Sequence, residues 1–221
     1  MHRLEVNVST DKIIVEYRDI PLSYFLGWFH RMLIEQPNYK VRRTHFGNRY
    51  VYQLLIKMDD GVHLYVMYQN QQEGERACYS LRIESRPEHL DMFADHLEAF
   101  KQRASEVNFV SCDVAYDVPV PLTAVFVGSH DMRRKLTVYK GTRYFGLPTK
   151  RKRDGYCRVY DKKLELLERR GIQISNDLTR IEMVYRPEAR VALIDIVHHP
   201  PTQNRHYFAS VIDDWGELPA K

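Results

Sequence analysis

The chain has 221 residues, of which 44% are hydrophobic, and its formal net charge is +4 at pH 7. Its three cysteines are odd in number and far apart, which excludes a disulfide framework and a zinc ribbon. No apolar run approaches the roughly 20 residues that cross a bilayer, and the first residues lack the apolar core of a secretory signal, so we expect a cytoplasmic protein with no membrane partner.

The first half of the chain combines strand patterns with two amphipathic helices. Strands are predicted where β-branched and aromatic residues alternate with polar ones, over residues 12–17, 50–58, 62–68 and 77–84. Asp59-Asp60-Gly61 predicts a hairpin turn, because Asp-Gly supports positive φ. Helices are predicted over residues 21–36, where apolar side chains recur near a 3.6 period, and over 87–104, which opens with a proline.

The second half repeats this plan with shorter elements. Strands are predicted over residues 107–117, 135–139, 143–146, 156–160 and 178–185, with a turn or short helix over 119–127. A helix over 162–170 ends at Gly171, a residue suited to the position after a helix. A further helix is expected after Pro187.

A short internal repeat relates the two halves. Arg82-Ile83-Glu84 precedes Arg86-Pro87-Glu88, and Arg180-Ile181-Glu182 precedes Arg186-Pro187-Glu188. We therefore predict an α+β fold in which two related halves, about 1–105 and 106–221, form a curved, largely antiparallel sheet with helices on one face. The whole chain, 1–221, would be a single domain.

Positive charge is concentrated in one segment. Between Arg133 and Lys163 there are twelve Lys and Arg residues against two Asp. Such a segment in a nearly neutral chain is typical of a protein that binds a polyanion. The run Lys150, Arg151, Lys152 and Arg153 is predicted to contact DNA phosphates, and Arg180 is predicted to contact DNA as well, although a solvated basic turn would look the same as the run.

Residues two apart share one face of a strand, so positions 113, 115 and 117 point the same way. Asp113 and Asp117 flank the small Ala115 in this way, and Glu84 and Glu182 lie in the two repeat strands. Neighbouring carboxylates repel one another unless a cation lies between them, and hard oxygen ligands select Mg²⁺ or Mn²⁺. The alternative is ordinary ion pairing with the arginines of the same strands.

Tyr160 lies among cations, with Arg158 on the same strand face and Lys162 and Lys163 just after it. Cations stabilise a phenolate and so lower the pKa of a phenol, and they can also hold a phosphate. A tyrosine can form covalent intermediates when it is activated. Tyr160 is therefore a candidate nucleophile, although a packing role is equally consistent, and the weaker competitors are Tyr139, Tyr144 and Tyr156.

Several motifs occur in a fixed order. They are Leu81-Arg82-Ile83-Glu84, Asp113-Val114-Ala115-Tyr116-Asp117, Thr142-Arg143-Tyr144-Phe145-Gly146, Arg158-Val159-Tyr160-Asp161-Lys162-Lys163-Leu164-Glu165 and Thr179-Arg180-Ile181-Glu182. Over residues 75–185 the chain resembles the replication initiators of staphylococcal-type rolling-circle plasmids, the Rep_trans class. Members of that class are usually longer, with a C-terminal region for origin binding, so reduced sequence-specific recognition is expected here.

The resemblance implies an enzyme that nicks and rejoins DNA at the plasmid double-strand origin through a 5′-phosphotyrosine bond. Tyr160 would be the nucleophile, and Arg158, Lys162 and Lys163 would contact phosphate. Glu84, Asp113 and Glu182 would hold Mg²⁺ or Mn²⁺, with Asp117 as a fourth ligand. The expected partners are single-stranded or cruciform origin DNA, a host helicase and a second subunit, and the chain itself has no P-loop for helicase activity.

Three rival hypotheses remain open on the sequence. A non-enzymatic DNA-binding protein would keep the basic segment and use the acids structurally. A metal-dependent nuclease that activates water would cleave DNA without a covalent adduct. A phage replication or integration factor of related architecture would share the motifs.

Overall fold

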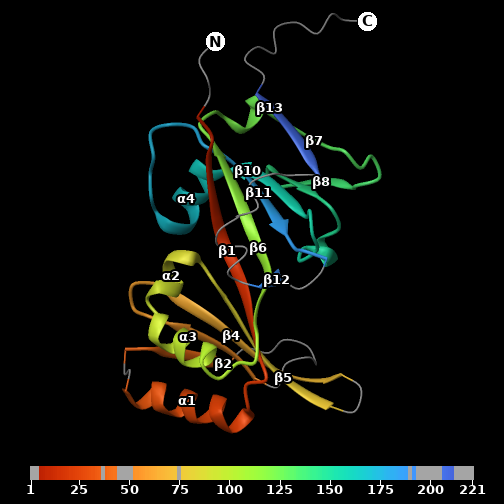
Figure 1. The fold of residues 1–221 in the computed structure, drawn as a ribbon. Coiled ribbons are helices and arrows are strands. Elements are labelled where there is room, and N and C mark those ends of the chain that lie inside the picture. The colour runs from red at the N-terminus through yellow and green to blue at the C-terminus, as the bar shows by residue number, and fades with distance from the viewer. Residues whose placement is uncertain are drawn as a thin grey trace, which may run out of the picture. The chain divides into compact units, whose positions relative to one another are not determined.

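The computed structural model describes residues 5–35, 38–43, 52–73, 76–188, 191–192 and 206–211 (Figure 1). In chain order the elements are β1 (Asn7–Arg18), α1 (Leu22–Glu35), β2 (Lys40–Arg43), β3 (Tyr52–Lys57), β4 (His63–Glu73), β5 (Arg76–Ser85), α2 (Pro87–Asp91), α3 (Ala94–Lys101), β6 (Val107–Val118), η1 (Leu122–Ala124), β7 (Val125–Ser129), β8 (Leu136–Tyr139), β9 (Thr142–Phe145), η2 (Pro148–Lys150), β10 (Cys157–Asp161), α4 (Lys162–Arg170), β11 (Thr179–Tyr185), β12 (Val191–Ala192) and β13 (Tyr207–Val211).

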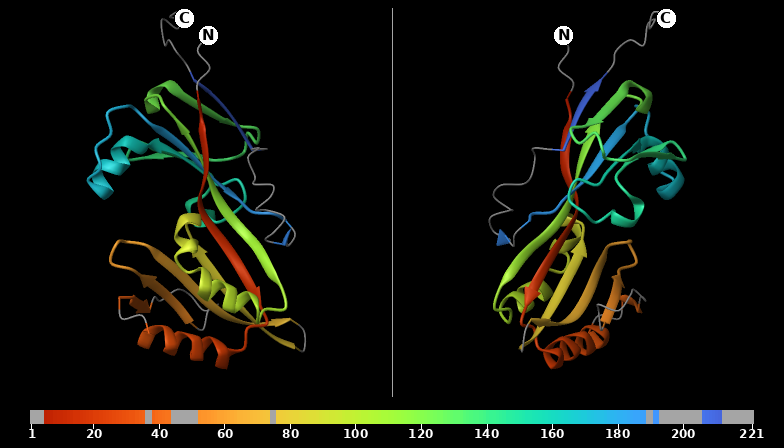
Figure 2. Two further views of the ribbon diagram at one scale, coloured as in Figure 1. Left: turned by 60° about the vertical axis from the view of Figure 1, so that its left-hand side comes forward. Right: turned by 90° about the vertical axis from the view of Figure 1, so that its right-hand side faces the viewer.

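The fold is α+β, as predicted from the sequence. Ten strands form an open antiparallel sheet in the order β2-β3-β4-β5-β1-β6-β11-β10-β9-β8, and β12 pairs with β6 off this path. The long strands β1 and β6 lie side by side in both views of Figure 2. Strands β7 and β13 make a separate two-stranded sheet. Among the described helices, none is long and apolar enough to cross a membrane.

The chain divides into two compact units, which we describe separately. The Tyr160 unit comprises Met1–Thr10, Asp113–Arg186 and Pro201–Lys221. The Glu16 unit comprises Asp11–Cys112 and Pro187–Pro200. Each unit contains one of the two repeat strands that the sequence analysis identified: β11 lies in the first and β5 in the second.

The Glu16 unit packs its helices against one face of its strands. Phe25, Trp28 and Met32 of α1 are buried together with Phe100 of α3, and the Trp28 and Phe100 rings lie 4.7 Å apart. Strand residues of alternate positions complete this core, including Leu54, Ile56, Leu64, Val66, Leu81 and Ile83. The opposite face of β5 is consequently left to Arg82 and Glu84.

The core of the Tyr160 unit lies on one face of β9, β10 and β11. It contains Phe145, Cys157, Val159, Ile181 and Met183, all buried. These residues alternate with Tyr144, Arg158, Tyr160, Arg180 and Glu182, which therefore share the other face. We call this other face the polar face of the Tyr160 unit.

Several predicted elements differ from those observed. The helix predicted over residues 87–104 is two helices, α2 and α3, because Phe93 leaves helical geometry (φ −112°, ψ 17°) to become buried. Strands β2, β7 and β13 were not predicted. The helix expected after Pro187 is wrong at Val191–Ala192, which pair with β6 as a strand, and residues 193–205 lie outside the described part of the chain.

Candidate active site

The site is built on the pairing of β10 with β11. In this register Arg158 lies opposite Glu182, and Tyr160 lies opposite Arg180. Directly opposite residues on an antiparallel pair have Cβ atoms about 5 Å apart, so these four side chains meet on the polar face. Their backbone neighbours Val159 and Ile181 are buried in the core behind them, which fixes the strands in this register.

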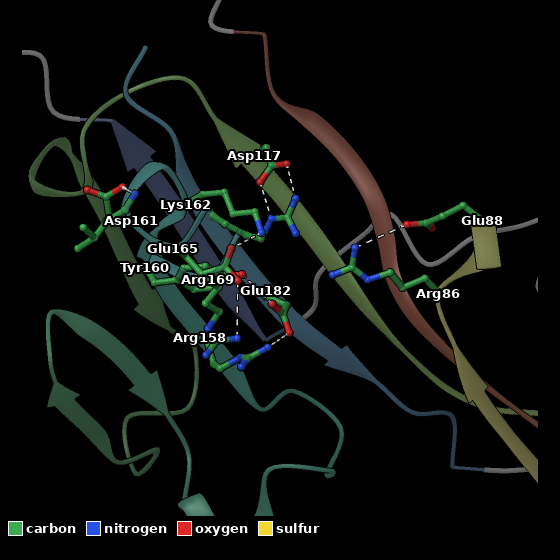
Figure 3. A network of polar contacts seen from close by, with 12 residues as sticks. Arg86, Glu88, Asp117, Arg158, Tyr160, Asp161, Lys162, Glu165, Arg169 and Glu182 are labelled. Carbon is green, nitrogen blue, oxygen red and sulfur yellow. Dashed lines mark hydrogen bonds and ion pairs between the residues drawn. The ribbon is translucent and has the colours of Figure 1, made fainter. Parts of the chain in front are cut away.

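Glu182 connects the phenol to a guanidinium. The Tyr160 hydroxyl donates a hydrogen bond to Glu182 Oε2 at 3.1 Å, and Arg158 Nη2 donates to Glu182 Oε1. Figure 3 shows the Glu182 carboxylate between these two partners. The Glu182 side chain is only 4% exposed, whereas that of Arg158 is 39% exposed. The carboxylate is thus nearly sealed from solvent, and the arginine reaches it from the surface.

A second ion pair lies beside the first. Arg180 Nε and Nη2 donate to the two carboxylate oxygens of Asp117, each at 2.7 Å. Both side chains are 12% exposed. Arg180 was predicted to contact DNA, and Asp117 to hold a metal, but in this structure each is engaged by the other. Such a bidentate pair fixes the position of Arg180 opposite Tyr160.

The pKa of Tyr160 is raised, not lowered as the sequence analysis expected. Burial is the largest cause, and the negative charge of Glu182 adds to it. Arg180 and Arg158 do lower the pKa, as predicted, but they do not outweigh burial and Glu182. The phenol is therefore protonated in neutral solution, and its activation requires a group that accepts the proton during attack.

Arg158 keeps its charge in this setting. Burial lowers its pKa, but the charge of Glu182, the hydrogen bond to it and the nearby Tyr160 and Asp113 raise the pKa above the ordinary value. Its guanidinium carbon also lies 5.9 Å from the centre of the Tyr160 ring. Arg158 is thus a permanent, partly exposed cation beside the phenol, as a phosphate contact requires.

The two lysines after Tyr160 lie at the start of α4, where the Asp161 side chain accepts a hydrogen bond from the Leu164 backbone N–H. Lys162 is 9% exposed and donates to Glu165 Oε2 at 2.6 Å, and its ammonium lies 6.0 Å from the Tyr160 ring centre. Lys163 donates instead to Asp177 and to the Ser175 carbonyl. Lys162 is therefore the nearer of the two to the phenol ring, and Lys163 holds the loop that leads to β11.

The basic run lies in the loop between β9 and β10. Lys150, Arg151, Lys152 and Arg153 are all exposed. The loop is anchored behind them, because Asp154 accepts hydrogen bonds from the Arg186 backbone and from His206. An ordered, exposed basic loop is consistent with the predicted DNA contact.

The predicted metal ligands do not all lie in one unit. Asp113, Asp117 and Glu182 belong to the Tyr160 unit, and Glu84 belongs to the Glu16 unit, where Lys12 lies 3.6 Å from it. In the described part of the chain, no three His, Cys, Asp or Glu side chains gather closely enough to hold a metal ion. Asp113 and Glu182 offer the carboxylate oxygens that a hard divalent cation prefers, but both Glu182 oxygens already accept hydrogen bonds, from Tyr160 and Arg158.

The contact between Tyr160 and Glu182 is the feature that sequence reasoning missed. Glu182 was predicted to hold a metal and was not connected with the phenol. The signal was present, since Tyr160 and Glu182 both follow the alternation of their strands, but the register between β10 and β11 was unknown. Compared with protein-family models and with curated protein sequences, the chain gives no match.

Proposed function

We propose that this protein nicks and rejoins single DNA strands at the origin of a rolling-circle plasmid, through a covalent bond to Tyr160. The observation that carries the proposal is the hydrogen bond from the Tyr160 hydroxyl to the nearly buried Glu182 carboxylate. A phenol that donates to a carboxylate, with a guanidinium on the other oxygen, has the arrangement of a nucleophile with its base and an orienting group. The motif order described above supplies the biological context.

The proposed reaction transfers a DNA phosphodiester to the Tyr160 oxygen. The Tyr160 oxygen attacks the scissile phosphorus while Glu182 Oε2 accepts the phenolic proton. The bond between phosphorus and the 3′ oxygen breaks, and that oxygen leaves with a proton from water. The product is a 5′-phosphotyrosine and a free 3′ hydroxyl. Because the phosphodiester energy stays in the covalent bond, attack by a 3′ hydroxyl reverses the step and rejoins the strand.

Cations of the site match the charge of the reacting group. Arg158 is partly exposed and lies beside the phenol, so it can move from Glu182 to a phosphate oxygen. Lys162 contributes positive charge from the first turn of α4. Asp113 would hold Mg²⁺ or Mn²⁺, which polarises phosphoryl oxygens when it is bound, while Glu182 serves as the base. We propose further that the enzyme acts in the cytoplasm as a homodimer, with a host helicase to unwind the duplex.

The test is an adduct assay with an end-labelled, single-stranded origin oligonucleotide and Mn²⁺. We expect a protein–DNA adduct that survives denaturation, is lost in Tyr160→Phe and persists in Tyr65→Phe. Tyr65 is the matched control, because it is also a strand tyrosine that donates to a side-chain oxygen, that of Gln53 at 2.9 Å. Cleavage without an adduct would indicate a nuclease that uses water, and binding without cleavage would indicate a non-enzymatic DNA-binding protein.

A further inference from the structure

The polar face continues past Tyr160 onto two more strands. Strand β9 pairs with β10 so that Tyr144 lies opposite Arg158, and β8 pairs with β9 so that Thr137 lies opposite Tyr144 and Tyr139 opposite Thr142. Since residues opposite one another share a face, Tyr139 and Tyr144 stand on the same face as Tyr160. Three tyrosines thus lie on three successive strands, with the small Thr142 between them.

These outer tyrosines are not used by the fold as other tyrosines are. Tyr24, Tyr68 and Tyr207 each donate their hydroxyl to a backbone carbonyl and help to pack the core. The hydroxyls of Tyr139 and Tyr144 make no hydrogen bond to any residue that the structure describes. Tyr139 is moreover 62% exposed, on the strand that ends the sheet. The Tyr139 ring is therefore available to a ligand, and Tyr144 is half-buried on the neighbouring strand.

A cation accompanies the exposed ring. Lys140 Nζ lies 5.7 Å from the Tyr139 ring centre. Lys140 and Gly141 form the two-residue turn between β8 and β9, with φ of 47° and 76°. Turns of this kind favour Asn, Asp or Gly at the first position, and a lysine there is conformationally unfavourable. The chain therefore places a positive charge at the hairpin tip at some expense in stability.

We propose that Tyr139, Tyr144 and Lys140 form a binding track for single-stranded DNA. The inference rests on the proposed function, because the track leads the bound strand away from Tyr160 as the nucleophile. Exposed bases stack on the two rings, while Lys140 and the basic loop after β9 neutralise phosphates. Aromatic rings interleaved with cations are how proteins hold single strands with little sequence preference. The charge supports this occupant, because twelve Lys and Arg residues against two Asp lie between Arg133 and Lys163.

Binding is measured without chemistry, in a Tyr160→Phe background, by fluorescence anisotropy of a labelled oligothymidylate about 20 nucleotides long. Tyr139→Ala and Tyr144→Ala should each weaken binding by about 5- to 150-fold, whereas Tyr139→Phe should retain it. Val138→Ala is the matched control, because Val138 is also 62% exposed but lies on the opposite face of the same strand. Affinity for a duplex should change little, since its bases are already stacked.

Lys140→Asn gives an independent test, because it removes the charge and favours the turn. It should raise the midpoint of thermal unfolding and make the salt dependence of log K shallower by about 0.7. Wild-type affinity in both alanine variants, or an equal loss in Val138→Ala, would overturn the track. If the wild-type protein forms the adduct but the Tyr139 and Tyr144 variants bind DNA normally, the track is refuted and the nicking function stands. If these variants bind more weakly but the wild-type protein forms no adduct, only the nicking function is refuted.

Discussion

Replacing Glu182 with glutamine tests the role of the carboxylate that contacts Tyr160. The change keeps the size of the side chain but removes its charge and its ability to take a proton. A positioned general base contributes about 10²- to 10⁴-fold to a rate. The rate of adduct formation should therefore decrease by about 10²- to 10⁴-fold in Glu182→Gln. The rate is measured in single turnovers, with rapid quenching and denaturing gels.

The dependence on pH gives a second readout. Burial and then Glu182 raise the pKa of Tyr160, so removal of the Glu182 charge should lower that pKa toward its ordinary value. The variant then depends on phenolate that forms in advance, and its residual rate should rise about tenfold per pH unit between about pH 7 and 9. The wild-type rate should stay nearly constant over this range, because Glu182 accepts the proton during attack.

Glu182→Gln should also lower the stability of the fold, and a second variant controls for this effect. In Glu182→Gln the unpaired Arg158 is 39% exposed, so water solvates part of its charge and the loss should be about 1–2 kcal/mol. Glu16→Gln breaks a comparable pair with Arg82, in which Glu16 is 3% exposed, at about 2–4 kcal/mol and without effect on the rate. A wild-type adduct rate in Glu182→Gln, or an equal loss of rate in Glu16→Gln, would refute the assignment.

Three further predictions concern stability and binding. Burial, reinforced by the charge of Glu98, raises the pKa of Tyr17 to about 12. The neutral phenol therefore stabilises the folded state fully below the unfolded pKa of 10.0, and this stabilisation is lost as the pH rises through 12. Over this range the free energy of unfolding of Tyr17→Phe should fall by about 3 kcal/mol less than that of the wild type, as measured by alkaline denaturation. Asp161→Ala removes the cap on the Leu164 N–H and should cost about 1 kcal/mol in urea denaturation, with no change expected in Asp161→Asn. Charge reversal at Arg151 and Lys152 should make the salt dependence of DNA affinity shallower, and an unchanged slope would leave that loop without a role in binding.

Strand alternation predicted which residues share a face but not which residues meet. Arg158 and Tyr160, and Arg180 and Glu182, lie two residues apart, and Asp113 and Asp117 lie four apart; the structure confirms that the residues of β10 and β11 share the polar face. The contact of Arg180 with Asp117 joins residues 63 positions apart. Such a contact depends on strand order and register, which are set by tertiary packing and leave no local signal.

Misplaced elements have similar causes. The stretch of residues 87–104 is apolar at helical spacing throughout, but burial of Phe93 at the core outweighs two positions of helical hydrogen bonding. Strand β2 is short and basic, so its pattern carries no apolar alternation, and it forms because β3 offers a free edge to pair with. In each case tertiary packing overrode the local preference.

The two repeat strands have different neighbours in the two units. In both, the arginine of the Arg-Ile-Glu motif pairs with an acid on a neighbouring strand: Arg180 with Asp117, and Arg82 with Glu16. The strand on the other side differs. Beside β11 it places Tyr160 opposite the arginine, within hydrogen-bonding reach of the glutamate. Beside β5 it places Met67 opposite the arginine and Tyr65 opposite Glu84, and the Tyr65 hydroxyl donates to Gln53 at 2.9 Å. The arginine-to-acid pair therefore recurs in both units, whereas a tyrosine opposite that arginine occurs only beside β11, and the proposed nicking chemistry rests on the hydrogen bond from that tyrosine to Glu182.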